Sequence, residues 1–360
     1  MKKLSVFLAI ILLVGILFVS GCNSTASTET STERLIDSQP FFPVDIDPSR
    51  AAYLDWIKDF EELTDGRYNV EQTWGGVLGT LETNYDTVLS GRSDFGMFIP
   101  KDSDRSFPMS EVVTLPFGFS PADIRTEAWL EVFRKGYFEE EYSDVKVILM
   151  AAGTCTDDLL TVSPVNSMAD LKGMKIAVSG GVSQQEIIKA MGATPVFATP
   201  MDVSTMLERG IVDGLFMSSY GLYMNQYAEY VKYFYPQVRF TSIVEAWVLN
   251  KDAYNRMPED VKAIVDDMSV MKTDKYSMNL ARIEAQELDA VLDKFLSTTG
   301  TEIYWGEEDV TELSEICSLQ FERWISDKTA MGYPAKEVVD EYYNNLKELG
   351  VENPSIGYTP

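Results

Sequence analysis

The 360-residue sequence contains no histidine, only three cysteines, and 30 basic side chains against 56 acidic ones. Without histidine, the chain cannot carry a Ser-His-Asp triad, a Cys-His pair, a histidine-ligated zinc or a histidine-bound haem. Its formal charge of −26 argues against nucleic-acid binding, because a phosphate-binding surface needs clustered lysine and arginine. Most hydrolytic and metal-dependent enzymes are therefore excluded and no cofactor is expected, although acid–base chemistry by lysine, aspartate or tyrosine remains open.

The first 22 residues have the pattern of a bacterial lipoprotein signal peptide. Lys2 and Lys3 precede an apolar run of sixteen residues, Leu4–Val19, which is shorter than a membrane span needs. The run ends in Val-Ser-Gly-Cys, which resembles a lipobox that makes Cys22 the acylated first residue of the mature chain. We predict a signal peptide at residues 1–21, a palmitate-type lipid anchor at Cys22, and export to the periplasm or cell exterior. An ordinary signal peptide that happens to end in cysteine is the alternative.

Two cysteines remain beyond the predicted anchor, Cys155 and Cys317, which lie 162 residues apart. An exported protein could join them in a disulfide, but the geometry that decides such pairing is not visible in the sequence. Two buried free thiols are the expectation that we favour.

From Arg34 onward, strand-like and helix-like segments alternate, which is typical of an α/β fold. Hydrophobic residues form 45% of the chain, and its length suggests two lobes. The stretch Glu259–Thr299 contains neither glycine nor proline and predicts one long helix across both lobes, with a break near Met271–Asp274 as the alternative. Asp309 and Glu312 have the spacing of a capping box that opens a later helix. Other strands are expected at 68–74, 95–99, 144–150, 175–178 and 214–217, and other helices at 47–63, 81–89, 184–191, 202–209 and 334–349.

Several short motifs follow one another in a fixed order. Residues 170–178 read Asp-Leu-Lys-Gly-Met-Lys-Ile-Ala-Val, followed by Gly-Ala-Thr-Pro-Val at 192–196 and Glu-Arg-Gly-Ile-Val-Asp-Gly at 208–214. The others are Gly-Val-Leu-Gly at 76–79, Thr-Leu-Pro-Phe-Gly-Phe at 114–119 and Asn-Lys-Asp-Ala-Tyr-Asn-Arg-Met-Pro at 250–258. As an ordered set covering about residues 34–299, they resemble the extracytoplasmic solute receptors of TRAP transporters, of the dicarboxylate-receptor type.

The resemblance implies a two-lobe, periplasmic-binding-protein-like α/β fold with a hinge, a long helix spanning both lobes, and no enzymatic activity. Such a receptor captures a small organic solute and delivers it to a permease that has a small and a large membrane subunit. We expect lobe I at 34–154 plus 243–282 and lobe II at 155–242 plus 283–350, with a Ser/Thr-rich tether at 22–33 before them and a tail at 351–360 after them. The strand crossings near 151–153 and 241–243 are the expected hinges.

The usual carboxylate clamp of the family is missing from this chain. By resemblance, an arginine belongs where this chain has Ala177, a second arginine near Asp157, and an asparagine where it has Met217. A carboxylate that leaves water needs charge-assisted hydrogen bonds, so simple dicarboxylates are expected to bind poorly. A neutral or zwitterionic solute, or one that carries an amine or an aromatic ring, is expected to bind better.

The remaining candidate solute contacts are acidic and aromatic residues near these positions. Asp157 and Glu245 would accept hydrogen bonds from the solute, and Trp247 shares a strand face with Glu245. The candidate rings are Trp74, Phe216, Tyr220 and Trp247, with core packing as the alternative for each of them. Three other functions stay open: an organic-acid receptor that uses another arginine such as Arg92 or Arg125, a ligand-sensing lipoprotein on the same fold, and an enzyme.

Overall fold

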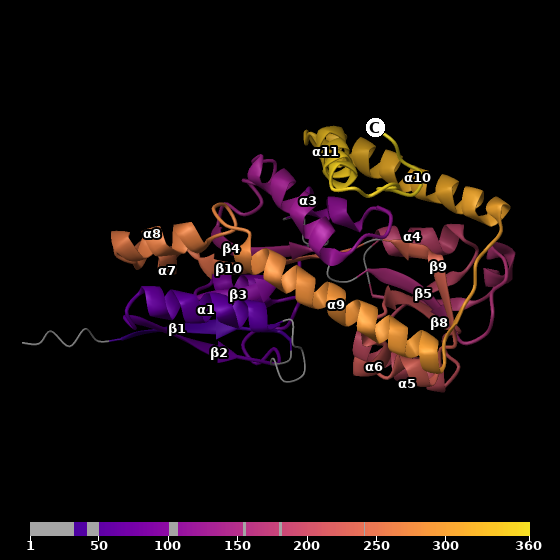
Figure 1. Cartoon of the computed structure of the whole chain (residues 1–360), viewed down its shortest axis with the longest axis horizontal. Coiled ribbons are helices and arrows are strands. Elements are labelled where there is room, and N and C mark those ends of the chain that lie inside the picture. The colour runs from indigo at the N-terminus through magenta and orange to yellow at the C-terminus, as the bar shows by residue number, and fades with distance from the viewer. Residues whose placement is uncertain (1–31, 42–49, 101–106, 154–155, 180–181, 241) are drawn as a thin grey trace, which may run out of the picture.

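The computed structural model describes residues 32–41, 50–100, 107–153, 156–179, 182–240 and 242–360, which form two α/β lobes (Figure 1). Lobe I contains a five-stranded sheet in the order β2-β1-β3-β10-β4, and lobe II contains a six-stranded sheet in the order β11-β9-β5-β8-β6-β7. The strands are β1 (Glu33–Ser38), β2 (Tyr68–Thr73), β3 (Phe95–Phe98), β4 (Val145–Ala152), β5 (Asp157–Thr161), β6 (Lys175–Val178), β7 (Thr194–Phe197), β8 (Gly214–Ser218), β9 (Tyr233–Phe240), β10 (Val244–Asn250) and β11 (Thr301–Glu302). The helices are α1 (Ala51–Leu63), α2 (Asn84–Leu89), α3 (Ala122–Arg134), α4 (Val182–Ala190), α5 (Pro200–Glu208), α6 (Gly221–Met224), α7 (Lys251–Arg256), α8 (Glu259–Met268), α9 (Lys275–Thr298), α10 (Glu307–Ala330) and α11 (Ala335–Glu348).

The sheet of lobe I is covered on both faces. β1 pairs in parallel with β2 and β3, and β10 lies antiparallel between β3 and β4. Residues of α1, α8 and α9 pack on one face, and residues of α3 and α11 pack on the other. α1 presents Tyr53, Trp56 and Phe60 to its face at helical spacing, and it ends before Asp65 and Gly66, which adopt φ values of 52° and 67°.

The sheet of lobe II is built in the same way. β6 pairs in parallel with β7 and β8, and β5 lies antiparallel between β8 and β9. Residues of α4 and the first half of α10 pack on one face. Residues of α5 and the C-terminal part of α9 pack on the other face. Of its elements, β6, β8, α4 and α5 begin and end within two residues of the bounds that the sequence predicts.

The lobes are joined at four places. The chain passes from β4 to β5 after Gly153 and from β9 to β10 before Val244, and the Gly153 N–H donates to the Ile243 carbonyl at 3.1 Å, so these two crossings lie side by side. Both coincide with the expected hinge segments, of which Thr241 lies outside the described residues. α9 contacts α1, α3 and β4 in lobe I and α6 in lobe II (Figure 1). The fourth connection is made by α10 and α11.

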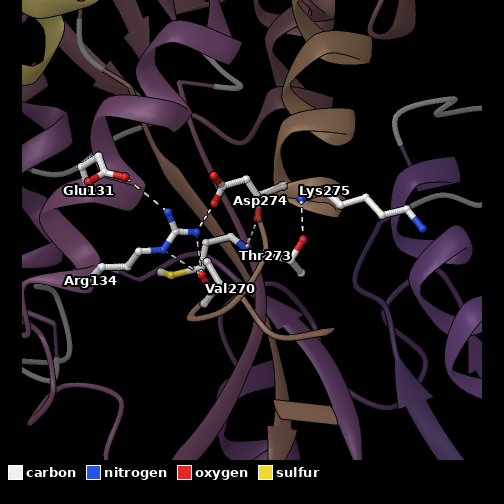
Figure 2. A network of polar contacts seen from close by, with 8 residues as sticks. Glu131, Arg134, Val270, Thr273, Asp274 and Lys275 are labelled. Atoms are coloured by element: carbon white, nitrogen blue, oxygen red, sulfur yellow. Dashed lines mark hydrogen bonds and ion pairs between the residues drawn. The ribbon is translucent and has the colours of Figure 1, made fainter. Parts of the chain in front are cut away.

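The continuous helix predicted for Glu259–Thr299 is wrong, and its alternative, a break, is what the structure has. α8 ends at Met268 because the Ser269 hydroxyl bonds to the Asp266 carbonyl and the Val270 N–H donates to Ile148 of β4 at 3.1 Å. Figure 2 shows how Arg134 of α3 fixes the following turn. Its Nε and Nη2 donate to the Val270 carbonyl at 3.1 and 2.8 Å, and Nη2 also pairs with Asp274. α9 alone, about 36 Å long at 1.5 Å per residue, therefore spans the lobes.

The C-terminal helices depart from the predicted lobe boundaries. Leu313, Ile316 and Cys317 of α10 pack in lobe II, but the second half of α10 and the whole of α11 belong to the core of lobe I that contains α3. Assigning residues 283–350 to lobe II as one block is therefore wrong. The segment predicted as a tail is also packed, since the Gly118 N–H donates to the Pro354 carbonyl at 2.8 Å and the Ile356 N–H donates to the Pro116 carbonyl at 2.9 Å.

Three further expectations concern features outside the sheets. The predicted capping box does not form, because α10 begins at Glu307 and the Asp309 carboxylate accepts the Met168 N–H at 2.9 Å instead. Cys317 is a buried free thiol, whereas Cys155 and the predicted lipidation site Cys22 lie outside the described residues. Where the structure describes the chain, none of the helices has the length and apolarity that crossing a membrane requires.

Candidate ligand-binding site

The strand ends of each sheet supply the candidate site. β1 and β2 run toward lobe II in Figure 1, and β10, which is antiparallel to β3, starts at the same edge of the sheet. In lobe II, the parallel strands β6 and β8 end at Val178 and Ser218. Open α/β sheets bind ligands outside the carboxyl ends of their strands, so side chains at these edges are the candidate solute contacts.

A buried ion pair lies at the edge of lobe I. The Arg50 guanidinium, just before α1, donates from Nη1 and Nη2 to the Glu245 carboxylate at 3.2 and 3.4 Å, and the two side chains are only 5% and 2% exposed. The same guanidinium lies 5.0 Å from the ring centre of Phe41 and 5.4 Å from that of Trp247. Two charges held together in this way compensate each other's loss of hydration. Glu245 is therefore already neutralised by the protein.

Asp37 of β1, in the same lobe, is a buried carboxyl group that forms no ion pair with any described residue. It is fully buried, and the Gln39 side-chain amide donates to its two oxygens at 2.9 and 3.1 Å. Burial raises the pKa of Asp37 to about 7, although the hydrogen bond from Gln39 lowers it. Tyr53 of α1 faces the same carboxyl, and its ring lies 5.7 Å from that of Trp247. We call Asp37, Gln39, Arg50, Tyr53, Glu245 and Trp247 the lobe I cluster.

Several polar atoms inside the lobe I cluster form no hydrogen bond with the described residues. Three of its buried atoms have no hydrogen-bond partner among the described residues: Gln39 Oε1, Tyr53 Oη and Trp247 Nε1. The Tyr53 hydroxyl is close enough to Asp37 to lower the pKa of its carboxyl group, although the two groups form no hydrogen bond of good geometry. Buried polar atoms in folded proteins are nearly always paired, so unpaired atoms concentrated in one place indicate a position for a ligand or ordered water.

A second charged cluster, the hinge cluster, lies where the strands cross between the lobes. Arg239, near the end of β9, pairs through Nε with the fully buried Asp158 at 2.9 Å and lies 3.5 Å from the ring centre of Phe119. Its Nη2 atom is buried and has no hydrogen-bond partner among the described residues. Arg125 of α3 is also buried there and donates to Ser120 Oγ at 3.3 Å and to the Gly118 carbonyl at 3.0 Å.

Lobe II presents mainly apolar side chains at the predicted site positions. Ala177, Phe216 and Met217 are at most 2% exposed and belong to the cores on the two faces of its sheet. Asp157 is buried and accepts a hydrogen bond from Gln184 of α4, and Tyr220, after β8, donates to Glu287 of α9. In this lobe the polar candidates are tied to helices of the protein.

The sequence-predicted residues therefore fall into three groups. Glu245 and Trp247 meet in the lobe I cluster, although Glu245 is bound to Arg50 and the Trp247 ring is fully buried. Trp74 is half-buried directly after β2. Four candidates lie in lobe II on β5, β6 and β8 with their side chains buried, and Tyr220 follows β8 half-buried.

Sequence reasoning missed the residues that carry most of the polar chemistry. Asp37 follows Leu35 at an inward strand position, and this break in the apolar pattern could have been noticed. Arg50 and Arg239 gave no local signal, because each is defined by a partner distant in the chain. Of the two alternative arginines, Arg92 donates to the Leu78 carbonyl at 2.9 Å and Arg125 lies in the hinge cluster.

Within the described ranges, no group of three or more acidic or cysteine side chains is placed to hold a metal ion. Among the described residues, the candidate site contains buried ion pairs, a carboxyl group, Asp37, that forms no ion pair with any of them, and aromatic rings. Such a set can bind a small polar molecule through hydrogen bonds and charge, with rings to cover its apolar part.

Comparisons with known proteins agree with the two-lobe fold. The family model for bacterial extracellular solute-binding proteins, family 7 (DctP), matches residues 44–320. A solute-binding protein of Sulfitobacter sp. (strain NAS-14.1) is 26% identical over 223 residues, which are 59% of this chain and 66% of that protein. This chain thus spans slightly less than two thirds of that relative.

Two solved structures share the fold over nearly their whole length. A TRAP periplasmic solute-binding protein from Desulfovibrio salexigens has a TM-score of 0.77 at 23% identity, covering 92% of this chain and 98% of that one. A marine metagenome TRAP solute-binding protein, specific for aromatic acid ligands and solved with metahydroxyphenylacetate, has a TM-score of 0.76 at 18% identity, covering 88% and 99%. At these identities the likeness establishes the fold.

Proposed function

The chain belongs to family 7 of the bacterial extracellular solute-binding proteins, and on that premise we propose that it captures a small organic solute for a TRAP-type permease. The family consists of receptors, so the chain is a binding protein and not an enzyme. The observation that carries the proposal is the two-lobe fold, matched by the family over residues 44–320. A permease with a small and a large membrane subunit would be the partner. A ligand-sensing lipoprotein on the same fold remains the alternative.

We further propose that the receptor is attached to the membrane through a lipid on Cys22. The support is the sequence pattern of residues 1–22, an apolar run too short to span a bilayer followed by Val-Ser-Gly-Cys. Metabolic labelling with a fatty acid tests the anchor. Label should enter the wild-type protein and be lost in Cys22→Ser, and label that persists in the variant would contradict it.

For the solute, the support favours a neutral, zwitterionic, amine-bearing or aromatic compound. Ala177 stands where a clamping arginine is expected by family resemblance, and its surroundings are apolar and closed. Arg50 is engaged by Glu245, so it is not freely offered to a solute carboxylate. The metagenome relative that takes aromatic acids indicates that this fold accommodates a ring.

One observation supports an organic acid instead. Arg239 Nη2 is a buried guanidinium nitrogen without a hydrogen-bond partner among the described residues, although Nε is bound to Asp158. A solute carboxylate could pair with that nitrogen. In this second candidate function, Arg239 would replace the missing arginine at position 177.

A thermal-shift screen tests the receptor function and ranks the solute classes. Organic acids, amines, amino acids, polyols and aromatic acids are added to the purified chain. A compound at about 100-fold its dissociation constant should stabilise the folded state by about 2.7 kcal/mol. Small-angle scattering with the best compound should then give a smaller radius of gyration, as lobe closure requires. No stabilisation by any class would contradict a small-solute receptor.

A further inference from the structure

We infer that Asp37 is the recognition group for a protonated nitrogen on the solute, so that the substrate class is an amine, ammonium zwitterion or guanidinium compound. The inference rests on the proposed receptor function and names the chemistry of its site. Its starting point is a fully buried carboxyl group at the carboxyl end of β1, at the edge of lobe I that faces lobe II.

The first observation is that Asp37 lacks a countercharge. None of the described lysines and arginines pairs with it, and the groups that act on it are Gln39, Tyr53 and the backbone at Ser38. A buried ionised carboxylate without a cation loses hydration that neutral donors replace only in part. A positively charged group of the solute would supply the countercharge that the described residues do not provide.

The second observation is the arrangement of unpaired atoms around this carboxyl. Gln39 binds Asp37 through its amide nitrogen, which leaves Gln39 Oε1 as a buried acceptor without a partner among the described residues. Tyr53 Oη is unpaired beside it. An ammonium group has three N–H donors, so one can go to Asp37 and the others to acceptors such as these. Trp247 Nε1 remains as a donor for a different part of the solute.

The third observation is a control within the same lobe. Glu141 is also buried, and burial raises its pKa to about 7, as for Asp37. Unlike Asp37, it accepts bonds from the backbone N–H groups of Met109 and Ser110 and from the Ser110 hydroxyl. Glu141 is thus a structural carboxyl group with its hydrogen bonds satisfied. Asp37 has one neutral side-chain donor in hydrogen-bond geometry and lies among unpaired atoms.

Arg50 shows that the edge of lobe I already accommodates a cation. Its guanidinium stacks near two rings and pairs with Glu245, a carboxylate on the strand that carries Trp247. This pair is complete, so the second carboxyl of the cluster, Asp37, is the one available to a solute. Because Asp37 is fully buried, a solute can reach it only after neighbouring side chains move.

The test compares probes that share a skeleton and differ in charge. One set is benzylamine, benzoate and benzyl alcohol, and the other is 4-aminobutyrate and succinate. Each is titrated calorimetrically into the mature wild-type chain, Asp37→Asn and the matched control Glu141→Gln. We expect an amine in at least one set to bind at least tenfold more tightly than its acid. Asp37→Asn should weaken that binding at least tenfold, and Glu141→Gln should change it less than twofold.

The outcomes separate the inference from the receptor function. If acids bind and amines do not, and Arg239→Gln removes the acids, the receptor function stands and the role of Asp37 is overturned. If the Asp37→Asn variant does not fold, the affinities of the wild-type chain decide. Tighter binding of the amine than of its acid supports the inference, and tighter binding of the acid overturns it. If neither these probes nor a wider library of amines, acids and polyols binds, both the receptor function and the inference fail.

Discussion

The two lobes place their buried charges differently along the edges that face each other. Lobe I buries charge there: Asp37, Arg50 and Glu245 are at most 5% exposed. Lobe II places Ala177, Phe216 and Met217 at the ends of β6 and β8, all within apolar cores, and carries its buried ion pair, Asp158 with Arg239, on β5 and β9 beside the crossings. Burying a charged group lowers the stability of the fold unless a group of opposite charge compensates it, whereas burying apolar side chains requires no such partner. If the proposed receptor function holds, we expect lobe I and the crossings to supply the charged contacts to the solute, and β6 and β8 of lobe II to supply an apolar wall.

The largest effect should come from breaking the charge balance of lobe I. Arg50→Ala leaves the Glu245 carboxylate buried and uncompensated, which should lower the free energy of unfolding by about 3–5 kcal/mol. Arg34→Ala is the control, because Arg34 pairs with Glu71 on the surface and should contribute at most about 1 kcal/mol. Urea unfolding monitored by circular dichroism measures both. Equal, small losses would show that the buried pair carries no special weight.

The next effect concerns Asp37 and is pH-dependent. Its pKa of about 7 in the folded state exceeds the usual value, so stability is full below pH ~4 and declines as pH rises through 7. Asp37→Asn removes this decline and should raise stability at pH 8 by up to about 4 kcal/mol, with little effect at pH 4. Tyr53, the titratable group beside it, has its pKa raised further by burial and stays neutral. The measurement is the free energy of unfolding of both proteins at pH 4 and pH 8. If Asp37→Asn changed it by the same amount at both pH values, the raised pKa of Asp37 would be refuted.

Introducing the arginine that the family resemblance expects at position 177 tests the apolar character of this part of lobe II. Ala177→Arg introduces a long charged side chain into a closed core and should destabilise the fold by about 1–3 kcal/mol or more. It should not create tight binding of succinate, because the arginine has no open space at that position. Lys175→Arg, on the same strand but exposed, should change stability by less than about 0.5 kcal/mol. Micromolar succinate binding by Ala177→Arg would overturn this description of lobe II.

The smallest effect should come from one polar contact between lobe II and α9. Tyr220→Phe removes the hydrogen bond to Glu287 and should cost about 0.5–1.5 kcal/mol in stability. Tyr304→Phe is the control, since its hydroxyl bonds to Glu302 at 3.1 Å on the surface and should matter less. Thermal unfolding at equal protein concentration compares them. A larger loss in the control than in Tyr220→Phe would argue against a structural role for this contact.

The sequence predicted the fold well because local rules set it. The apolar spacing of α1 and the short β6 and β8 segments were readable from period and turn residues. The break before α9 was foreseen only as an alternative, since its cause is Val270 pairing with β4 and Arg134 binding the turn. The place of α11 on lobe I likewise depends on its contacts with α3.

The candidate site was harder to predict for the same physical reason. Arg50 and Glu245 are 195 residues apart, and nothing local to either residue indicates the other. Whether a ring such as Trp247 packs in a core or covers a solute depends on which helices lie over its strand. Ala177 was informative because a family motif fixed its position, and the structure adds that its surroundings are closed.

The position of helix α9 affects how the two lobes can move relative to each other. It is fixed to lobe I at the turn held by Arg134, contacts α6 of lobe II at its other end, and runs beside two strand crossings bonded to each other through Gly153 and Ile243. We expect bending about the paired crossings to be the motion by which the lobes close. Such a movement would convert the presence of a solute into a change in the distance between the outer ends of the lobes. A protein that touches only the outer ends of the lobes could sense occupancy of the site without contacting the solute.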